Sequence, residues 1–134
     1  MEQKLIKLAL KAKENAYTPY SKFNVGAALL TESGEIFTGC NVENASYGLA
    51  NCAERTAIFK AVSEGHTKFQ KIAVVTDIED FASPCGACRQ VMVEFGLDIE
   101  VLMGNNSGKF YSKTSGELLP CSFTSEQLDK NTTG

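Results

Sequence analysis

The sequence predicts an α/β fold in which helices cover a central sheet. In the middle of the chain, short apolar runs typical of buried strands alternate with segments whose apolar residues recur at helical spacing. The 134 residues, of which 43% are hydrophobic and 22% charged, suit a globular chain with one core. We therefore expect a single domain over residues 1–134.

The first third of the chain predicts a helix followed by a hairpin. Pro19 ends the helix, because proline lacks the N–H that a continuing helix needs. Two apolar segments, 25–31 and 35–43, are separated by Ser33-Gly34, which indicates a turn between paired strands. The helix presents one apolar stripe, made of Leu5, Leu8, Ala9, Ala12 and Ala16.

The middle of the chain predicts a helix, a strand and a second helix. Residues 52–64 place alanines and Ile58 on one helical face, and 71–77 is a short buried-type strand. The next helix is expected to begin with Ser83 as its cap and Pro84 at its first position, where proline is favoured. A glycine at position 96 is expected to stop it.

The last third is less regular. Residues 98–104 predict another strand, and 109–130 predict a strand and then a short helix around "TSEQL". The terminal "NTTG", residues 131–134, is expected to be frayed.

Composition excludes several classes of protein. The formal net charge is −3 and the lysines and arginines are scattered, so we expect no nucleic-acid partner. No apolar run is long enough to span a bilayer, and the first residues lack the apolar core of a signal peptide, so we expect no membrane partner and a cytoplasmic protein. Five cysteines without an export signal favour metal or redox chemistry over a disulfide framework.

Three cysteines are predicted to lie at helix starts. Cys52 opens one predicted helix, and Cys85 and Cys88 share a face at the start of another. The free N–H groups and partial positive charge of a helix start favour thiolate over thiol. Zinc prefers such ligands, and three of them leave a fourth position for water. The spacing therefore predicts a catalytic zinc site.

Two neighbours of Cys52 would complete such a site. Glu54 is close enough to take a proton from a metal-bound water and return it to a substrate. Arg55, three residues past Cys52, would hydrogen-bond a ligand sulfur and offset the negative charge. The pattern also fits a capping box, with Asn51 as the cap and Glu54 three residues later, so catalysis and capping both remain open for Glu54.

Two other interpretations of the cysteines remain open. A structural zinc site would need a fourth ligand, for which Cys40, Cys121 and His66 are the candidates. A redox dithiol would use "PCGAC" alone and would leave Cys52 and Glu54 unexplained. If Cys40 and Cys121 are not ligands, we expect them to be small buried residues.

Four motifs in order resemble the zinc-dependent cytidine deaminase superfamily. "CAE" followed by "PCGAC" is similar to its metal signature, with cysteine where the polynucleotide-editing members have histidine. The three-cysteine set is similar to the small, homotetrameric enzymes that act on free nucleosides. The matching segments are "AYTPYSKFNVGAALL" (16–30), "TGCNVENASYGLANCAERTAIFKAVSEG" (38–65), "SPCGACRQVMVEF" (83–95) and "LLPCSF" (118–123).

The resemblance implies a fold and an activity. The fold would be a three-layer α-β-α arrangement around a five-stranded mixed sheet. The activity would be hydrolytic deamination of cytidine and 2′-deoxycytidine to uridine and 2′-deoxyuridine in pyrimidine salvage, with release of ammonia. Each subunit would hold one Zn²⁺ on Cys52, Cys85 and Cys88, and Glu54 would transfer the protons.

The resemblance also assigns substrate contacts. Phe23 would stack on the pyrimidine ring, and Asn41 and Glu43 would hydrogen-bond the ribose, chiefly its 3′-hydroxyl. The backbone of Ala53 and of Ser83 would contact the base. Three residues would reach the site from neighbouring subunits of a homotetramer: Ala45, Tyr47 and Phe123. Without the resemblance, a structural role is the better explanation for five of these residues, as core, packing or solvated strand positions: Phe23, Asn41, Glu43, Tyr47 and Phe123.

Two other functions stay open. The same machinery would deaminate a different aminopyrimidine nucleoside, such as a nucleoside antibiotic. A zinc-stabilised binding module without chemistry is the other possibility, and it requires four protein ligands.

Overall fold

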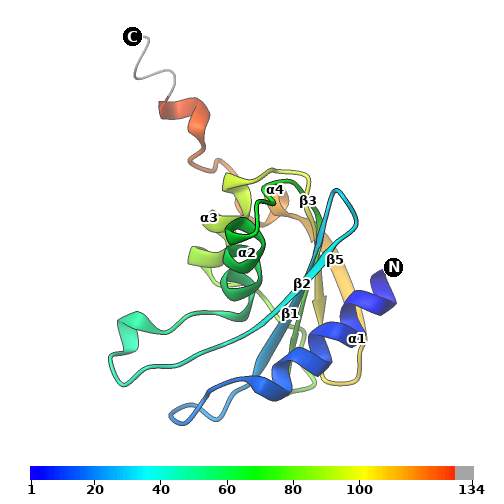
Figure 1. Ribbon diagram of the computed structural model, residues 1–134, viewed down its shortest axis with the longest axis vertical. Coiled ribbons are helices and arrows are strands. Elements are labelled where there is room, and N and C mark those ends of the chain that lie inside the picture. Colours follow the sequence, from blue (N-terminus) through cyan, green and yellow to red (C-terminus); the bar gives the residue numbers. More distant parts are fainter. Residues whose placement is uncertain (129–134) are drawn as a thin grey trace.

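The structure, a computed structural model, describes residues 1–128 and places five strands between helices (Figure 1). In sheet order they are β2 (Ile36–Cys40), β1 (Val25–Thr31), β3 (Phe69–Thr76), β4 (Glu100–Gly104) and β5 (Phe110–Thr114). β3 and β4 are parallel and the other pairs are antiparallel. The predicted five-stranded mixed sheet is confirmed. The prediction that residues 131–134 are frayed concerns residues outside those that the structure describes.

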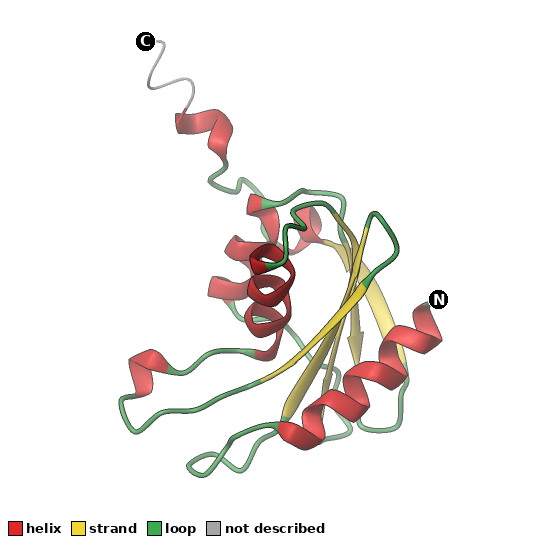
Figure 2. Cartoon of the chain, viewed as in Figure 1, coloured by secondary structure: helices red, strands yellow, loops and turns green. Residues whose placement is uncertain are grey.

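Helices cover both faces of the sheet (Figure 2). α1 (Glu2–Ala12) packs on one face, and α2 (Ala53–Ser63) and α3 (Gly86–Glu94) pack on the other. Short 3₁₀ turns cover Lys13–Asn15 (η1) and Tyr47–Leu49 (η2), and α4 covers Ser115–Leu118. The three-layer prediction is therefore confirmed. Within the described residues, no helix is long and apolar enough to cross a membrane.

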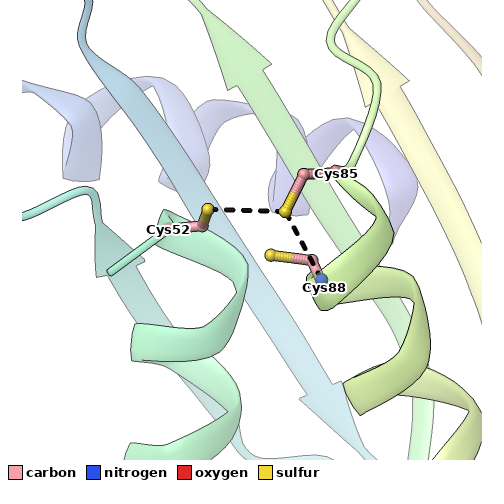
Figure 3. A group of neighbouring side chains, drawn as sticks. All are labelled: Cys52, Cys85 and Cys88. Carbon is pink, nitrogen blue, oxygen red and sulfur yellow. Dashed lines mark hydrogen bonds between the residues drawn. The ribbon is translucent and has the colours of Figure 1, made fainter. Parts of the chain in front are cut away.

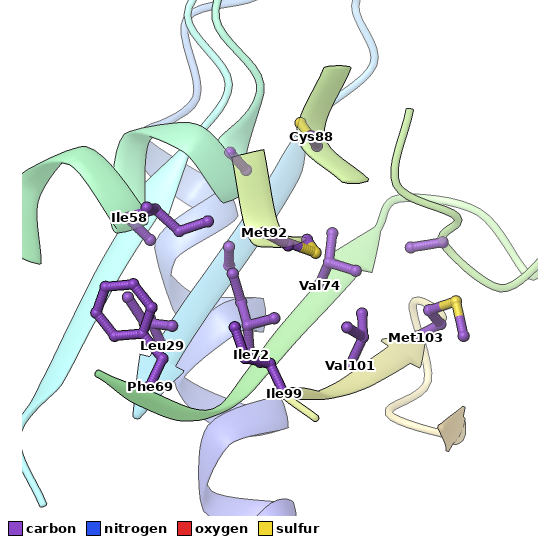
Figure 4. Close-up of a cluster of buried hydrophobic side chains, with 14 of the residues drawn as sticks. Leu29, Ile58, Phe69, Ile72, Val74, Cys88, Met92, Ile99, Val101 and Met103 are labelled. Carbon is purple, nitrogen blue, oxygen red and sulfur yellow. The ribbon is translucent and has the colours of Figure 1, made fainter. Parts of the chain in front are cut away.

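The two faces bury separate apolar clusters. The cluster under α1 includes Leu5, Ala28 and Leu102, each fully buried. The cluster under α2 and α3 is larger and contains Leu29, Ile58, Ile72 and Met92 (Figure 4). It also contains Cys88, which is 0% exposed, so one predicted metal ligand lies at the edge of the core. The core therefore fixes that ligand by packing as well as by helix geometry.

Several predicted boundaries are wrong. α1 ends at Ala12 and continues only as the η1 turn, so the helix ends well before Pro19. β2 ends at Cys40 rather than at residue 43, because Val42 leaves the ladder and forms an isolated bridge to Asn51. Asn41 and Glu43 are therefore not alternating positions on a strand. The hairpin turn is confirmed, with Gly34 at φ +95°. A helical turn begins at Ser125 and extends to Leu128, the last described residue.

Residues Cys40 and Cys121 are not buried. Cys40, at the end of β2, is partly exposed, and Cys121 is exposed with a backbone φ of +56°. The prediction that both are small buried residues is wrong. β2 is an edge strand of the sheet, which leaves Cys40 accessible.

Gly39 allows α2 to approach β2 closely. A Cβ at position 39 would lie 2.6 Å from the backbone nitrogen of Ala57 and 2.7 Å from the backbone oxygen of Ala53. Real Cβ atoms do not approach backbone atoms this closely, so only glycine fits between this strand and this helix. The N-terminus of α2 carries Cys52 and Glu54, so this contact helps to place the candidate site.

We expect Gly39→Ala to lower the free energy of unfolding by about 1–3 kcal/mol, because the added methyl group must push α2 away from β2. Urea unfolding at fixed protein concentration measures the change. Gly48→Ala is the matched control, since a Cβ there meets nothing within 4 Å, and it should change stability by less than about 0.5 kcal/mol. Equal stability of the Gly39 variant and the wild-type chain would contradict this packing account.

Candidate metal centre

The structure brings the three predicted cysteine ligands together. The sulfur atoms of Cys52, Cys85 and Cys88 all lie within 4.8 Å of one another (Figure 3). The Sγ atoms of Cys52 and Cys85 are 3.7 Å apart, which is too far for a disulfide bond. All five cysteines lie within residues 1–128, and all are free. The donor set therefore fits a soft divalent cation such as zinc.

Both helices begin at a cysteine. Cys52 is the N-cap of α2, and Cys85 is the N-cap of α3. The Sγ of Cys85 accepts a hydrogen bond from the backbone N–H of Cys88, in the way that a serine cap would. The positive ends of two helix dipoles thus converge on the sulfur cluster and favour its ionised form.

The residues that cap α2 and α3 are not the ones that were predicted. Asn51 does not cap α2, because its backbone is held in the bridge to Val42 and its amide donates to Thr56 Oγ1 at 3.1 Å. The helix starts one residue later, so Glu54 is its second residue rather than its third, and no side chain caps it. The capping-box interpretation of Glu54 is therefore wrong. The predicted cap Ser83 likewise precedes the true cap, Cys85.

The environment of the sulfurs stabilises negative charge on one of them. Hydrogen bonds from the Cys88 thiol and from the Arg55 guanidinium lower the pKa of Cys52 to about 5, against the opposing effect of burial. The same bond to Cys52 raises the pKa of the Cys88 thiol. Arg55 Nη2 lies 3.3 Å from Cys52 Sγ, as expected for a residue that offsets thiolate charge. Its Nε is buried and has no hydrogen-bond partner among the described residues.

Glu54 is buried beside the cluster. Its side chain is only 4% exposed. Burial raises the pKa of this carboxyl to about 7, and the negative charge of Cys52 adds to the effect. A carboxyl group with a pKa near neutrality both accepts and donates protons efficiently at physiological pH. Glu54 therefore has the environment of an acid–base group, not that of a surface cap.

An open pocket of about 330 Å³ leads to this centre. Cys52, Glu54 and Cys85 line it, and so do Phe23, Asn41, Ala53 and Ser83. These seven residues were all predicted from the sequence. Six further residues that line the pocket were not: Val25, Val74, Thr76, Ile78, Phe81 and Ala82. They follow from the fold, because the carboxyl end of β3 and the loop after it form one wall.

The remaining predicted contacts lie elsewhere in this chain. Glu43 and Tyr47 line a second pocket next to Tyr20. The Glu43 carboxylate accepts hydrogen bonds from the backbone N–H groups of Tyr20 and Ser21, both at 3.1 Å, and from the Ser21 hydroxyl. Phe123 is 55% exposed. Ala45, also predicted, is exposed and does not line the metal-centre pocket.

No fourth metal ligand joins the cysteines among the described residues. The group of histidine, cysteine and acidic side chains that converges here contains Cys52, Cys85 and Cys88 alone. Instead, the Nε2 atom of His66 lies 2.9 Å from Oε2 of Glu35, and the His66 ring packs against the ring of Phe37. The four-ligand structural zinc site is therefore not supported. Three ligands and a pocket leave access for water and a substrate.

Arg89 is a residue of the site that the sequence did not single out. Its guanidinium donates to the Pro84 backbone oxygen, to the Leu118 backbone oxygen and to Ser83 Oγ, all at 2.8 Å. These bonds hold the residues just before α3 against the C-terminal part of the domain. Arg89 thus fixes the wall of the pocket that Ser83 forms.

Comparison with known proteins gives a consistent result. The family model for the cytidine and deoxycytidylate deaminase zinc-binding region matches residues 1–104. A cytidine deaminase of Halalkalibacterium halodurans is 55% identical over 128 residues, covering 95% of this chain and 97% of that protein. The crystal structure of a cytidine deaminase from Burkholderia pseudomallei is 52% identical, with a TM-score of 0.89, and the match covers 92% of this chain and 99% of that one. A blasticidin-S deaminase of Bacillus cereus is 37% identical over 112 residues, covering 78% and 79% of the two chains.

Proposed function

We infer the activity from one premise, which is that this chain belongs to the cytidine and deoxycytidylate deaminase family. It is a zinc-dependent enzyme that converts cytidine and 2′-deoxycytidine, with one water, to uridine and 2′-deoxyuridine and releases ammonia. The observation that supports this most directly is the buried carboxyl of Glu54 beside three convergent thiols, with Glu54, Cys52 and Cys85 lining one pocket.

The three cysteines have distinct places in the proposed metal site. Cys88 is held rigidly by the core, Cys52 and Cys85 terminate two helices, and Arg55 balances their charge. Zinc bound there would supply Lewis-acid activation of a water molecule. The net negative ligand set opposes this activation, and the Arg55 guanidinium and two helix dipoles reduce that opposition.

Glu54 is proposed to move the protons of the reaction. Its carboxylate takes a proton from the attacking water and gives it to ring nitrogen N3, which makes C4 more electrophilic. Glu54 then passes the second proton of the same water to the exocyclic nitrogen. The bond between C4 and that nitrogen breaks, and ammonia is the leaving group. Burial keeps bulk water away from this carboxyl, so each proton returns to the substrate.

Two polar residues and one aromatic residue are proposed to hold the nucleoside. Phe23, which lines the pocket, is proposed to stack on the base, and Asn41, which also lines it, to contact the ribose. Glu43 is proposed to bind the 3′-hydroxyl with a carboxylate that the N–H groups of residues 20 and 21 already orient. A site tuned to a hydroxyl discriminates strongly against ligands that lack it.

We propose that the enzyme is a homotetramer with shared active sites. In one chain Tyr47 is 77% exposed, Leu49 70% and Phe123 55%, and Tyr47 and Leu49 lie together on the η2 turn, which suits a surface that a second chain covers. Ala45, Tyr47 and Phe123 do not line the metal-centre pocket of their own chain, which supports their proposed contact with a neighbouring subunit's site. Sedimentation equilibrium should give the mass of four chains, whereas the mass of one chain would rule out these contacts.

The rest of the organisation is proposed on similar grounds. We propose that residues 1–134 form one catalytic domain and that the enzyme works in the cytoplasm in pyrimidine salvage. Five free cysteines suit a reducing compartment. Fractionation of cells followed by a deaminase assay would locate the enzyme, and activity confined to an exported fraction would contradict the proposal.

The Glu54→Gln variant should be folded and loaded with zinc but should lose about 10³-fold or more in kcat for cytidine, because an amide cannot carry protons. Absorbance of cytidine measures turnover, and metal analysis measures the zinc content. Glu64→Gln, an exposed change just beyond the other end of α2, is the matched control and should retain full activity. A Glu54→Gln chain with normal turnover would remove the proposed proton carrier.

A substrate panel tests the ribose contacts and the antibiotic alternative. Cytidine and 2′-deoxycytidine should both be deaminated, and 3′-deoxycytidine should lose about 10²-fold or more in kcat/KM, because it cannot form the hydrogen bonds that Asn41 and Glu43 are proposed to make to the 3′-hydroxyl. Faster deamination of blasticidin S than of cytidine would instead favour the function that the name of the Bacillus cereus relative states. Equal rates with and without the 3′-hydroxyl would remove the proposed role of Asn41 and Glu43.

A further inference from the structure

Phe23 lies on a loop that is held mainly through its backbone. The Phe23 N–H donates to Ser21 Oγ at 3.0 Å, and its carbonyl oxygen accepts from Asn41 Nδ2 at 2.8 Å. The side chain is 37% exposed where it lines the pocket. The position of the Phe23 ring therefore follows the position of the backbone of residues 22–24. The hydrogen bonds that hold this backbone determine where the ring lies.

Asp77 anchors the backbone of the residue that follows Phe23. Its Oδ2 accepts a hydrogen bond from the backbone N–H of Asn24 at 3.0 Å, one residue after Phe23. The sheet explains this contact: Val25 of β1 pairs with Thr76 of β3 in antiparallel register, so Asn24 and Asp77 leave their strands side by side. Asp77 itself is not among the residues that line the pocket.

Lys13 fixes the orientation of the Asp77 carboxylate. Its Nζ lies 2.7 Å from Oδ1, the oxygen that Asn24 does not use. The side chains of Lys13 and Asp77 are 19% and 34% exposed, so the pair is partly shielded from water. Gly26 of β1 lets the chain segment that carries Lys13 lie close against the strand. A Cβ at position 26 would lie 2.0 Å from the Ala9 backbone oxygen and 2.7 Å from the Lys13 backbone nitrogen. The negative charge of the Asp77 carboxylate also strengthens the hydrogen bond that it accepts from the Asn24 backbone N–H.

The backbone of Asp77 and of the next residue is held by Asn106, which follows β4. The Asp77 carbonyl oxygen accepts from Asn106 Nδ2 at 3.3 Å, and the Asn106 N–H donates to the Ile78 oxygen at 3.0 Å. Ile78 lines the pocket on the loop that follows β3. Asp77 thus connects the loop that carries Phe23 to the loop after β3, and residues of both loops line the pocket.

We propose that Asp77 is a positioning residue that sets the place of the Phe23 ring against the substrate base. The proposal rests on the stacking role of Phe23 given under the proposed function. Asp77 would act on binding rather than on proton transfer, because Glu54 and the thiols are held by α2, α3 and the core. Its removal should therefore raise KM and leave kcat nearly unchanged.

The test is a double-variant cycle on the zinc-loaded full chain. Asp77→Ala should raise KM for cytidine about tenfold, as expected for the loss of one charge-assisted hydrogen bond, with kcat within about twofold of wild type. Phe23→Ala should lower kcat/KM by itself. Adding Asp77→Ala to Phe23→Ala should lower kcat/KM by less than about twofold further, because the ring that Asp77 positions is already gone.

Two further variants distinguish a specific effect of Asp77 on KM from a general loss of stability. Glu100→Ala breaks the Lys71–Glu100 pair, which has the same 2.7 Å separation as the Lys13–Asp77 pair. It should lower stability without changing KM. Lys13→Met keeps the Asp77 carboxylate and should raise KM less than Asp77→Ala does, which keeps the test usable if the alanine variant does not fold.

Three results would overturn the proposal: an unchanged KM in Asp77→Ala, a loss confined to kcat, or losses that multiply in the double variant. Failure of the proposed function is recognised separately, since the wild-type chain itself would then not deaminate cytidine. In that case amide hydrogen exchange decides the role of Asp77. Faster exchange of the Asn24 amide in Asp77→Ala than in Glu100→Ala supports the anchor, and equal exchange overturns it.

Discussion

The rest of the structure depends on the convergence of three cysteine sulfurs from two helix starts. Three thiols within 4.8 Å of one another are costly to assemble, because any ionised pair repels. The fold offsets that cost in several ways: the N-termini of α2 and α3 both face the cluster, Arg55 donates to Cys52, and the core holds Cys88. Gly39 lets the start of α2 lie close against β2. The metal centre is thus a consequence of how two helices pack on one sheet.

The chemistry and the recognition of the substrate are carried by different parts of the molecule. Glu54 and the thiols lie on helix starts that the core packs rigidly. Phe23, Asn41 and Glu43 lie on loops that are held by hydrogen bonds, many of them to backbone groups. Rigid placement suits proton transfer, which tolerates little movement, whereas loops accommodate entry of a ligand. The charged anchors Asp77 and Glu43 give these loops their order, and each acts by accepting from the backbone of residues 20–24.

The sequence predicted the parts of this arrangement that are local or periodic. The three-residue spacing of Cys85 and Cys88, the helix behind Cys52 and the alternation of strands and helices are such features, and the structure contains them. Helix starts were missed by one to two residues because tertiary contacts decided them: the bridge from Asn51 to Val42 delays α2, and Arg89 holds Ser83 and Pro84 outside α3. The role of Asp77 could not be foreseen, since it depends on the register of β1 against β3 and on Lys13, 64 residues earlier. The partly exposed Cys40 was missed because its burial depends on which strand forms the sheet edge.

The central claim is that one zinc ion on three cysteines enables this chain to deaminate cytidine. It is tested most directly by titrating the metal-free chain with zinc while cytidine absorbance is followed. The account predicts no turnover before zinc is added, and a linear rise that saturates at about one zinc per chain. The same curve is expected for the Cys40→Ser and Cys121→Ser variants, whereas Cys88→Ser should stay inactive. Full turnover without zinc, or none after one zinc per chain has bound, would contradict the account.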